Sequence, residues 1–202
     1  MALIKICGIT NYNDAKLAID LGADAIGFIF CESKRQISPQ KAKKIIDKLP
    51  IFSTTVGVFM NMKPSIVKEI SDFTKIDIIQ LHGNEPVATY YKIIGKKIIK
   101  RINPNNFHSA KEINNFIKNT IADAYLLDPG AGSGTGFSWE ILNELKKNKF
   151  IIAGGLSPKN IEGLIQQYNP YGVDANSGLE KFPGKKDKKK LEEFIKIIRR
   201  SE

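Results

Sequence analysis

The sequence predicts an α/β protein, a single (β/α)8 TIM barrel with short loops that takes in residues 1–202 as one catalytic domain. Three observations support this prediction. Short apolar runs alternate with longer amphipathic segments, a pattern typical of βα units with a parallel sheet. There are eight runs and eight segments, and no linker rich in glycine, serine or proline divides them. Eight even units favour a closed barrel over an open sheet, although 202 residues is near the lower limit for this fold.

Each predicted strand is a short apolar run bounded by polar or turn-forming residues. From the amino terminus, the strands are expected at residues 3–7, 25–30, 55–60, 78–82, 97–102, 124–128, 150–154 and 172–176. An aspartate precedes the core of every second strand, a weak repeat that is expected if two βα units form the repeating module. These aspartates are Asp24, Asp77, Asp123 and Asp174.

The predicted helices follow the strands. They are expected at residues 13–21, 39–49, 64–73, 85–94, 108–118, 138–147, 158–167 and 188–200. Two of these helices have a clear start signal, because Ser38-Pro39 and Ser157-Pro158 place a hydroxyl N-cap before a proline in the first turn.

The composition is that of a globular protein, with 42% hydrophobic and 26% charged residues. No apolar run approaches the roughly 18 residues that a membrane span needs, and the amino terminus lacks the secretory pattern. We therefore expect a soluble, cytoplasmic protein with no membrane partner. Cys7 and Cys31 are too few for a disulfide scaffold and lack zinc-site spacing, so no metal site is expected.

The chain is basic, with 31 Lys and Arg against 21 Asp and Glu and a formal charge of +10. This balance favours anionic partners, and nucleic acid is one of them. However, the lysines are scattered and are not interleaved with aromatic residues as in a nucleic-acid-binding surface. The charge is therefore interpreted as solvated surface, and no nucleic-acid partner is expected.

In a barrel of this kind, the site is built at the carboxyl ends of the strands and in the loops that follow them. Polar residues and glycines gather at those positions in this sequence. The strand ends carry Cys7-Gly8, Gln80 to Gly83, Asp128 to Gly130, Gly154-Gly155 and Asn176 to Gly178. One rim of the barrel is therefore the predicted site.

Seven blocks along the chain together resemble the phosphoribosylanthranilate isomerase family of tryptophan biosynthesis. They are Lys5 to Thr10, Ser33 to Ser38, Val56 to Phe59, Gln80 to Gly83, Leu126 to Asp128, Ala153 to Leu156, and Ser177-Gly178 through Phe182 to Lys185. The resemblance implies a single-domain barrel that converts N-(5-phosphoribosyl)anthranilate to its 1-deoxyribulose isomer by an Amadori rearrangement. It also implies a small-molecule phosphoribosyl substrate and no cofactor. The sequence leaves monomer and homodimer open.

The resemblance implies a catalytic pair. Cys7 matches the general base that removes the C2 proton, and cationic neighbours would increase its thiolate fraction. Asp128 matches the general acid, so burial or a nearby anion is expected to raise its pKa above about 3.9. Cys31 has no comparable context and is expected to be structural.

The other expected contacts bind substrate. Arg35 matches the family's arginine that pairs with the anthranilate carboxylate, for which a planar guanidinium is suited. His82 ends the fourth strand and is expected either to line the aromatic pocket or to hydrogen-bond a loop, with Gln80 beside it. Main-chain N–H groups in the loops after the seventh and eighth strands are expected to bind phosphate. The residues assigned there are Gly154, Gly155, Ser177 and Gly178.

The glycine-rich run at 130–136 is interpreted as a lid and not as a dinucleotide-binding loop, because its glycines lack the required spacing. Its expected hinge residues are Gly132, Gly134 and Gly136. Two departures from the family lie nearby, because its usual lysine and aspartate are replaced around Thr135 and Ser138. A further departure is Asn176, where relatives often carry serine.

Three alternatives stay open. A histidine-pathway sugar isomerase shares the fold and the chemistry but typically has an aspartate in place of Cys7. A basic nucleic-acid-binding protein would show steeply salt-dependent binding. A barrel whose catalysis has lapsed would bind a phosphate ligand without turnover.

Overall fold

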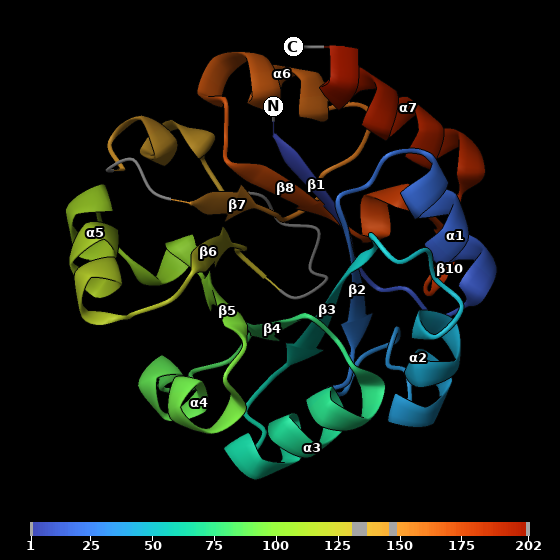
Figure 1. The fold of residues 1–202 in the computed structure, drawn as a ribbon. Coiled ribbons are helices and arrows are strands. Elements are labelled where there is room, and N and C mark those ends of the chain that lie inside the picture. Colours follow the sequence, from blue (N-terminus) through green and yellow to red (C-terminus); the bar gives the residue numbers. More distant parts are fainter. Residues whose placement is uncertain (1, 131–136, 146–148, 201–202) are drawn as a thin grey trace.

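The computed structural model describes residues 2–130, 137–145 and 149–200. Eight parallel strands form a closed barrel in the order β1 to β8, and β8 pairs with β1 to complete it. Figure 1 shows the strands at the centre and the helices around them. The predicted fold class is therefore confirmed.

The strands lie where the apolar runs predicted them. They are β1 (Leu3–Ile6), β2 (Ala25–Ile29), β3 (Thr54–Phe59), β4 (Ile78–Leu81), β5 (Lys97–Ile102), β6 (Ala124–Leu127), β7 (Phe150–Ile152) and β8 (Gly172–Ala175). Most end one or two residues earlier than predicted. Cys7, His82 and Asp128 therefore lie directly after their strands, and each still donates its main-chain N–H to a carbonyl of a neighbouring strand.

Seven α-helices occur in the described part of the chain. They are α1 (Tyr12–Asp20), α2 (Pro39–Ile46), α3 (Pro64–Thr74), α4 (Val87–Ile94), α5 (Ala110–Asn119), α6 (Ile161–Tyr168) and α7 (Lys188–Arg200). Ser38 caps α2 by accepting a hydrogen bond from the N–H of Lys41, as its sequence predicts. None of the described helices combines the length and apolarity that a membrane crossing requires.

The start predicted for α6 at Ser157-Pro158 is wrong. The helix begins at Ile161, and the N–H of Ser157 donates to the side chain of Asn160 over 2.9 Å. That bond closes a turn before the helix, so the serine is not its N-cap.

The α-helix expected at 138–147 is wrong for residues 138–145, which form a short 3-10 helix, η2 (Trp139–Asn143), and the turn after it; residues 146 and 147 lie outside the described residues. Trp139, Leu142 and Leu145 pack against the core. Trp139 and Leu142 are three residues apart, which places them on one face of η2, and Leu145 lies just beyond its end. The ring of Trp139 also meets that of Tyr168 edge to face, with centroids 6.5 Å apart.

A two-stranded hairpin follows β8 and was not predicted. It consists of β9 (Glu180–Phe182) and β10 (Lys185–Lys186), and η3 (Ser177–Leu179) precedes it. A third short 3-10 helix, η1 (Pro104–Asn106), follows β5. The strands of the hairpin are too short to produce a periodic signal, and only the Pro183-Gly184 turn marks them in the sequence.

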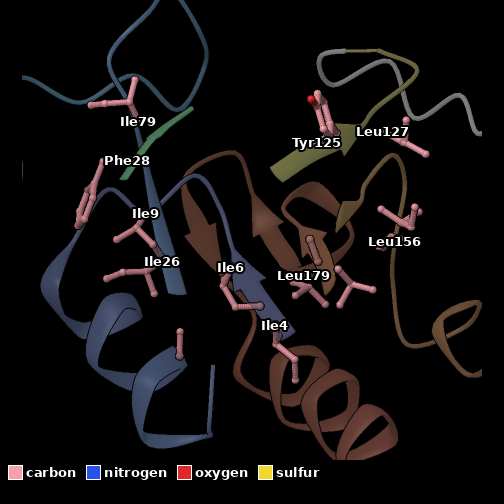
Figure 2. Packing of buried hydrophobic residues seen from close by; sticks show 14 of the residues in the cluster. Ile4, Ile6, Ile9, Ile26, Phe28, Ile79, Tyr125, Leu127, Leu156 and Leu179 are labelled. Atoms are coloured by element: carbon pink, nitrogen blue, oxygen red, sulfur yellow. The ribbon is translucent and has the colours of Figure 1, made fainter. Parts of the chain in front are cut away.

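Side chains alternate along each strand between the interior of the barrel and the helices outside. Figure 2 shows Ile4 and Ile6 of β1 and Phe28 of β2 among the buried side chains of the outer cluster, which the helices complete. A smaller cluster fills the inside. Its members are Val56, Ile99, Ala124, Leu126, Ile151 and Ala153. At the amino ends of the strands, a cavity of about 300 Å³ adjoins this cluster and is lined by Asp24, Lys97 and Asp123 among others, so polar side chains occur at both ends of the barrel.

Three of the four repeated aspartates join neighbouring strands at the opposite end of the barrel. Each stands directly before its strand and accepts a hydrogen bond of 2.7 to 2.8 Å from a main-chain N–H of the preceding strand. The pairs are Asp24 with Ile4, Asp77 with Thr55 and Asp123 with Ile98. Asp174 departs from this repeat, because it lies within β8 and faces inward.

We expect Phe194→Ala to lower the free energy of unfolding by about 3–5 kcal/mol, because this side chain of α7 is fully buried in the outer cluster. Urea denaturation measures the change. Phe182→Ala is the matched control, because Phe182 is 63% exposed; we expect a change within about 0.5 kcal/mol. Equal losses in the two variants would contradict the packing described here.

Candidate functional site

A cavity of about 370 Å³ opens at the carboxyl end of the barrel. It is lined by residues from the ends of the strands and from the loops that follow them. Eight of the residues expected in the site line it: Cys7, Arg35, Gln80, His82, Asp128, Gly154, Gly155 and Ser177. A larger cavity, of about 500 Å³, lies beside α4 and α5 and contains none of them.

Gly178 is not among the residues that line this cavity, and its expected contact with phosphate stays a prediction. A side chain at this position would overlap the carbonyl oxygen of Leu156. It therefore acts as a spacer that lets the loop after β8 pack on the loop after β7.

Cys7 follows β1 directly and is buried, and its N–H donates to the carbonyl of Ala175 over 2.9 Å. A Cβ atom on Gly27 of the neighbouring strand would lie 2.8 Å from the Cys7 sulfur and 3.1 Å from Nζ of Lys5. The thiol of Cys7 and the ammonium of Lys5 therefore both lie over Gly27. The absence of a side chain at this glycine gives them room.

Lys5 and Asp174 form a buried ion pair beneath Cys7. Nζ of Lys5 donates to Oδ2 of Asp174 over 2.8 Å, and Oδ1 of Asp174 has no partner among the described residues. Burial lowers the pKa of Lys5, but the charge of Asp174 opposes it and the net direction is upward. Lys5 is therefore a cation, and the free oxygen belongs to a residue that lines the cavity.

The pKa of the Cys7 thiol is raised. Burial is the main cause, and the positive charge of Lys5 opposes it. Asp174 adds a smaller upward contribution, and the charge of Lys186 a smaller downward one. At neutral pH, Cys7 is mainly a thiol, and its thiolate is stabilised by the cation beside it.

Asp128 follows β6 and lines the same cavity as Cys7. Burial raises the pKa of its carboxyl group, while the hydrogen bond from the N–H of Gly130 and the charge of Arg101 oppose the rise. The direction agrees with the expectation that this group holds its proton more strongly than an exposed aspartate does. Arg101 also donates from Nε to the carbonyl of Asp128 over 3.1 Å, which positions the loop.

His82 lies beside Asp128, with Nε2 3.7 Å from Oδ2 of the carboxyl. Burial and the charge of Arg101 lower the pKa of His82 to about 3, so the ring is neutral. Gln80 lies 3.2 Å from Nδ1 through its amide nitrogen, and in this orientation the amide donates and the ring proton lies on Nε2. A neutral imidazole gives Asp128 no counter-charge, so the pair is not a salt bridge.

Arg35 lines the cavity and forms a bidentate pair with Glu180. Its Nε and Nη2 lie 2.9 and 2.7 Å from Oε2 of the carboxylate, and the pair is largely buried. Lys186 donates to the other oxygen of Glu180 over 3.2 Å. The arginine expected to bind a substrate carboxylate therefore already holds one carboxylate of the protein itself.

The loops after β7 and β8 present free main-chain donors. Gly154 and Gly155 have φ angles of 97° and 67°, in the left-handed region that favours glycine. The N–H groups of Gly154, Gly155 and Ser177 donate no hydrogen bond to any residue in the described ranges. Such a group of donors is suited to an anion.

Sequence reasoning missed five charged residues of this site: Lys5, Arg101, Asp174, Glu180 and Lys186. A signal existed for Lys5, because it lies two residues before Cys7 in one extended run, and this spacing places both side chains on the inner side of the barrel. The same reasoning applies to Asp174 within the buried β8. Glu180 and Lys186 lie on the unpredicted hairpin. The expected lid residues Gly132, Gly134 and Gly136 lie outside the described residues.

The comparisons with known proteins agree on one family. A family profile described as N-(5'phosphoribosyl)anthranilate (PRA) isomerase matches residues 4–197. The N-(5'-phosphoribosyl)anthranilate isomerase of Pelobacter propionicus is 41% identical over 206 residues, which covers 98% of this chain and 96% of that protein.

Solved structures give the same result. The phosphoribosyl anthranilate isomerase of Thermus thermophilus superposes with a TM-score of 0.88 at 32% identity, covering 99% of this chain and 100% of that one. A phosphoribosyl anthranilate isomerase in complex with reduced 1-(o-carboxyphenylamino)-1-deoxyribulose 5-phosphate has a TM-score of 0.83 at 34% identity. That match covers 98% of this chain and 99% of that one.

We expect alkylation of Cys7 by iodoacetamide to accelerate continuously from about pH 7 to about pH 9.5, because burial raises its pKa and the thiolate is the reacting form. Mass spectrometry of the Cys31→Ser variant measures the rate without interference, with N-acetylcysteine as the control thiol. The raised pKa would be contradicted if the alkylation rate of Cys7 became constant at a pH below the midpoint of the pH profile of N-acetylcysteine.

Proposed function

Because the chain belongs to the N-(5'-phosphoribosyl)anthranilate isomerase family of tryptophan biosynthesis, we propose that it uses Cys7 and Asp128 to convert N-(5-phosphoribosyl)anthranilate to 1-(2-carboxyphenylamino)-1-deoxyribulose 5-phosphate. The observation that carries the assignment of roles is that Cys7 and Asp128 line one cavity. Arg35 and the free N–H groups after β7 and β8 lie around the same cavity. The proposal places the reaction in the cytoplasm and requires no cofactor, membrane or nucleic acid.

The reaction is an aldose–ketose isomerisation and requires an acid and a base. Asp128 gives its proton to the ring oxygen of the ribose, the C1–O bond breaks, and the nitrogen lone pair forms a protonated imine at C1. Cys7 thiolate then removes the proton from C2, and the electron pair of that C–H bond moves to form an enolamine. Tautomerisation of the enolamine gives the amino ketone, so no redox partner is needed.

Electrostatics support these two roles. Burial raises the pKa of Asp128, which favours the protonated acid, and the neutral His82 beside it does not oppose this effect. Burial also disfavours the Cys7 thiolate, but Lys5 supplies a buried positive charge that stabilises it. A base with a raised pKa is a stronger proton acceptor once it is ionised.

The two charged ends of the substrate have candidate partners in different loops of the cavity lining. Arg35 comes from the loop after β2 and carries the charge for the ring carboxylate. The loops after β7 and β8 provide the N–H donors for the phosphate, an arrangement common in barrels of this type. The substrate is therefore held at both ends while its C1–C2 unit faces the catalytic pair.

We expect Cys7→Ala and Asp128→Asn each to lower kcat by about 10²- to 10⁴-fold, because each removes one proton-transfer group. The substrate is generated enzymatically from anthranilate and phosphoribosyl pyrophosphate, and the loss of its fluorescence is followed. Circular dichroism checks that the variants stay folded.

Cys31→Ala is the matched control, because Cys31 is also buried at the cavity but has no proposed proton to transfer. It is expected to retain most of the activity. Near-normal turnover by both Cys7→Ala and Asp128→Asn would contradict the proposed roles of the two residues. Phosphate-ligand binding without turnover by the unmodified chain would instead point to a barrel that has lost its catalysis.

We expect Gly178→Ala to raise KM by roughly 10-fold, because the added methyl group displaces the Leu156 carbonyl and with it the loop proposed to bind phosphate. Gly163→Ala in α6 is the control, since a side chain there meets nothing within 4 Å. It is expected to leave KM unchanged and to stabilise the helix by up to about 1 kcal/mol. Steady-state kinetics of both variants test this, and an unchanged KM in Gly178→Ala would contradict it.

A further inference from the structure

Glu180 binds one edge of the Arg35 guanidinium. Nε of Arg35 lies 2.9 Å from each carboxylate oxygen, and Nη2 lies 2.7 Å from Oε2. A guanidinium offers two parallel-donor edges to a carboxylate: the Nε/Nη2 edge and the Nη1/Nη2 edge. Glu180 occupies the first, and Nη1 has no acceptor among the described residues. The second edge is free in a residue that lines the cavity.

Glu180 is itself held firmly, so it is a fixed support for Arg35. Its side chain is 4% exposed. Oε1 accepts hydrogen bonds of 3.2 Å from the N–H of Gly184 and from Nζ of Lys186, both in the hairpin region. Lys186 also donates to the carbonyl and side-chain oxygens of Asn176, which follows β8. The carboxylate is therefore anchored to the hairpin and, through Lys186, to the strand end.

The stem of Arg35 is confined from the other side. A Cβ atom on Gly8 would lie 2.9 Å from Cδ of Arg35, so the arginine crosses the backbone immediately after Cys7. Contact with Gly8 and the bidentate bond to Glu180 together leave the guanidinium little freedom. Its free edge therefore has a direction set before any ligand arrives.

The charges of this cluster do not cancel. Arg35 and Lys186 contribute two positive charges, and Glu180 contributes one negative charge. Burial raises the pKa of Glu180, but the hydrogen bond from Arg35 and the charge of Lys186 lower it overall, so the group is ionised. Burial lowers the pKa of Lys186, and the charge of Glu180 opposes this effect. With both basic groups charged, the three side chains carry one net positive charge, the sign that a ligand carboxylate requires.

We propose that Glu180 is a positioning residue that selects substrates carrying an aromatic carboxylate, by holding the Nη1/Nη2 edge of Arg35 toward the cavity. This inference rests on the proposed function, in which Arg35 binds the ring carboxylate. Glu180 makes no contact with the substrate and does not compete for it, because the two carboxylates use different edges of one guanidinium.

The test compares two ligands that differ only in the ring carboxylate. One is reduced 1-(o-carboxyphenylamino)-1-deoxyribulose 5-phosphate, and the other is the corresponding compound made with aniline. Calorimetry gives the Kd of each for the unmodified chain and for Glu180→Gln, Arg35→Lys and the double variant. We expect Glu180→Gln to raise the Kd of the carboxylated ligand by about 10-fold or more and that of the aniline ligand by less than about 2-fold.

The double variant separates positioning from general damage. If Glu180 acts through Arg35, Glu180→Gln causes no further loss for the carboxylated ligand once Arg35→Lys is present. Glu180→Asp is the second variant, used in case Glu180→Gln fails to fold. It keeps the charge but shortens the side chain, and the same selective loss is expected.

Four results would overturn the inference: equal weakening of both ligands, no weakening of either, tighter binding of the carboxylated ligand, or additive losses in the double variant. Its failure is distinguishable from failure of the proposed function. If Arg35→Lys selectively weakens the carboxylated ligand and Glu180→Gln does not, only the role of Glu180 is wrong. If Arg35→Lys has no selective effect, the proposed carboxylate anchor is wrong as well.

Discussion

The closure of eight parallel strands into one ring is the constraint on which the site depends. Parallel strands in a closed barrel all end at the same rim, and alternate side chains point inward along each of them. Cys7, Gln80 and Asp128 come from different βα units, yet they line one cavity for this reason. At the other end, aspartates before three strands bind main-chain N–H groups of their neighbours. The two ends therefore use the same strands for different purposes.

Burial explains the protonation states of the charged groups around the cavity at the carboxyl end of the barrel. The barrel interior below is filled with aliphatic side chains, so the charged groups near it have little water to solvate them. Lys5 is paired with Asp174, and Lys186 with Glu180. The same burial keeps His82 neutral and raises the pKa of Asp128. Burial thus favours the protonated form of Asp128, and the ion pair with Asp174 keeps Lys5 charged beside the thiol of Cys7.

The hairpin after β8 extends this network beyond the barrel. Through Glu180 and Lys186 it connects Arg35, in the loop after β2, with Asn176 after β8. It is also fastened to α1, because the N–H of Lys186 donates to the buried carboxylate of Asp14 over 2.8 Å. The position of the arginine therefore depends on elements far from it in the chain.

The order of the apolar runs determined the barrel, because eight short strands alternating with helices can bury their faces in few other ways. The rule that strand ends share a rim was enough to bring Cys7, Arg35 and Asp128 to one place. The tertiary structure alone decided the ion pairs Lys5–Asp174 and Arg35–Glu180, whose partners are 169 and 145 residues apart. It also decided the 3-10 form of η2 and the close approach of Gly178 to the carbonyl of Leu156. These features depend on distances and burial between distant segments, which local periodicity does not record.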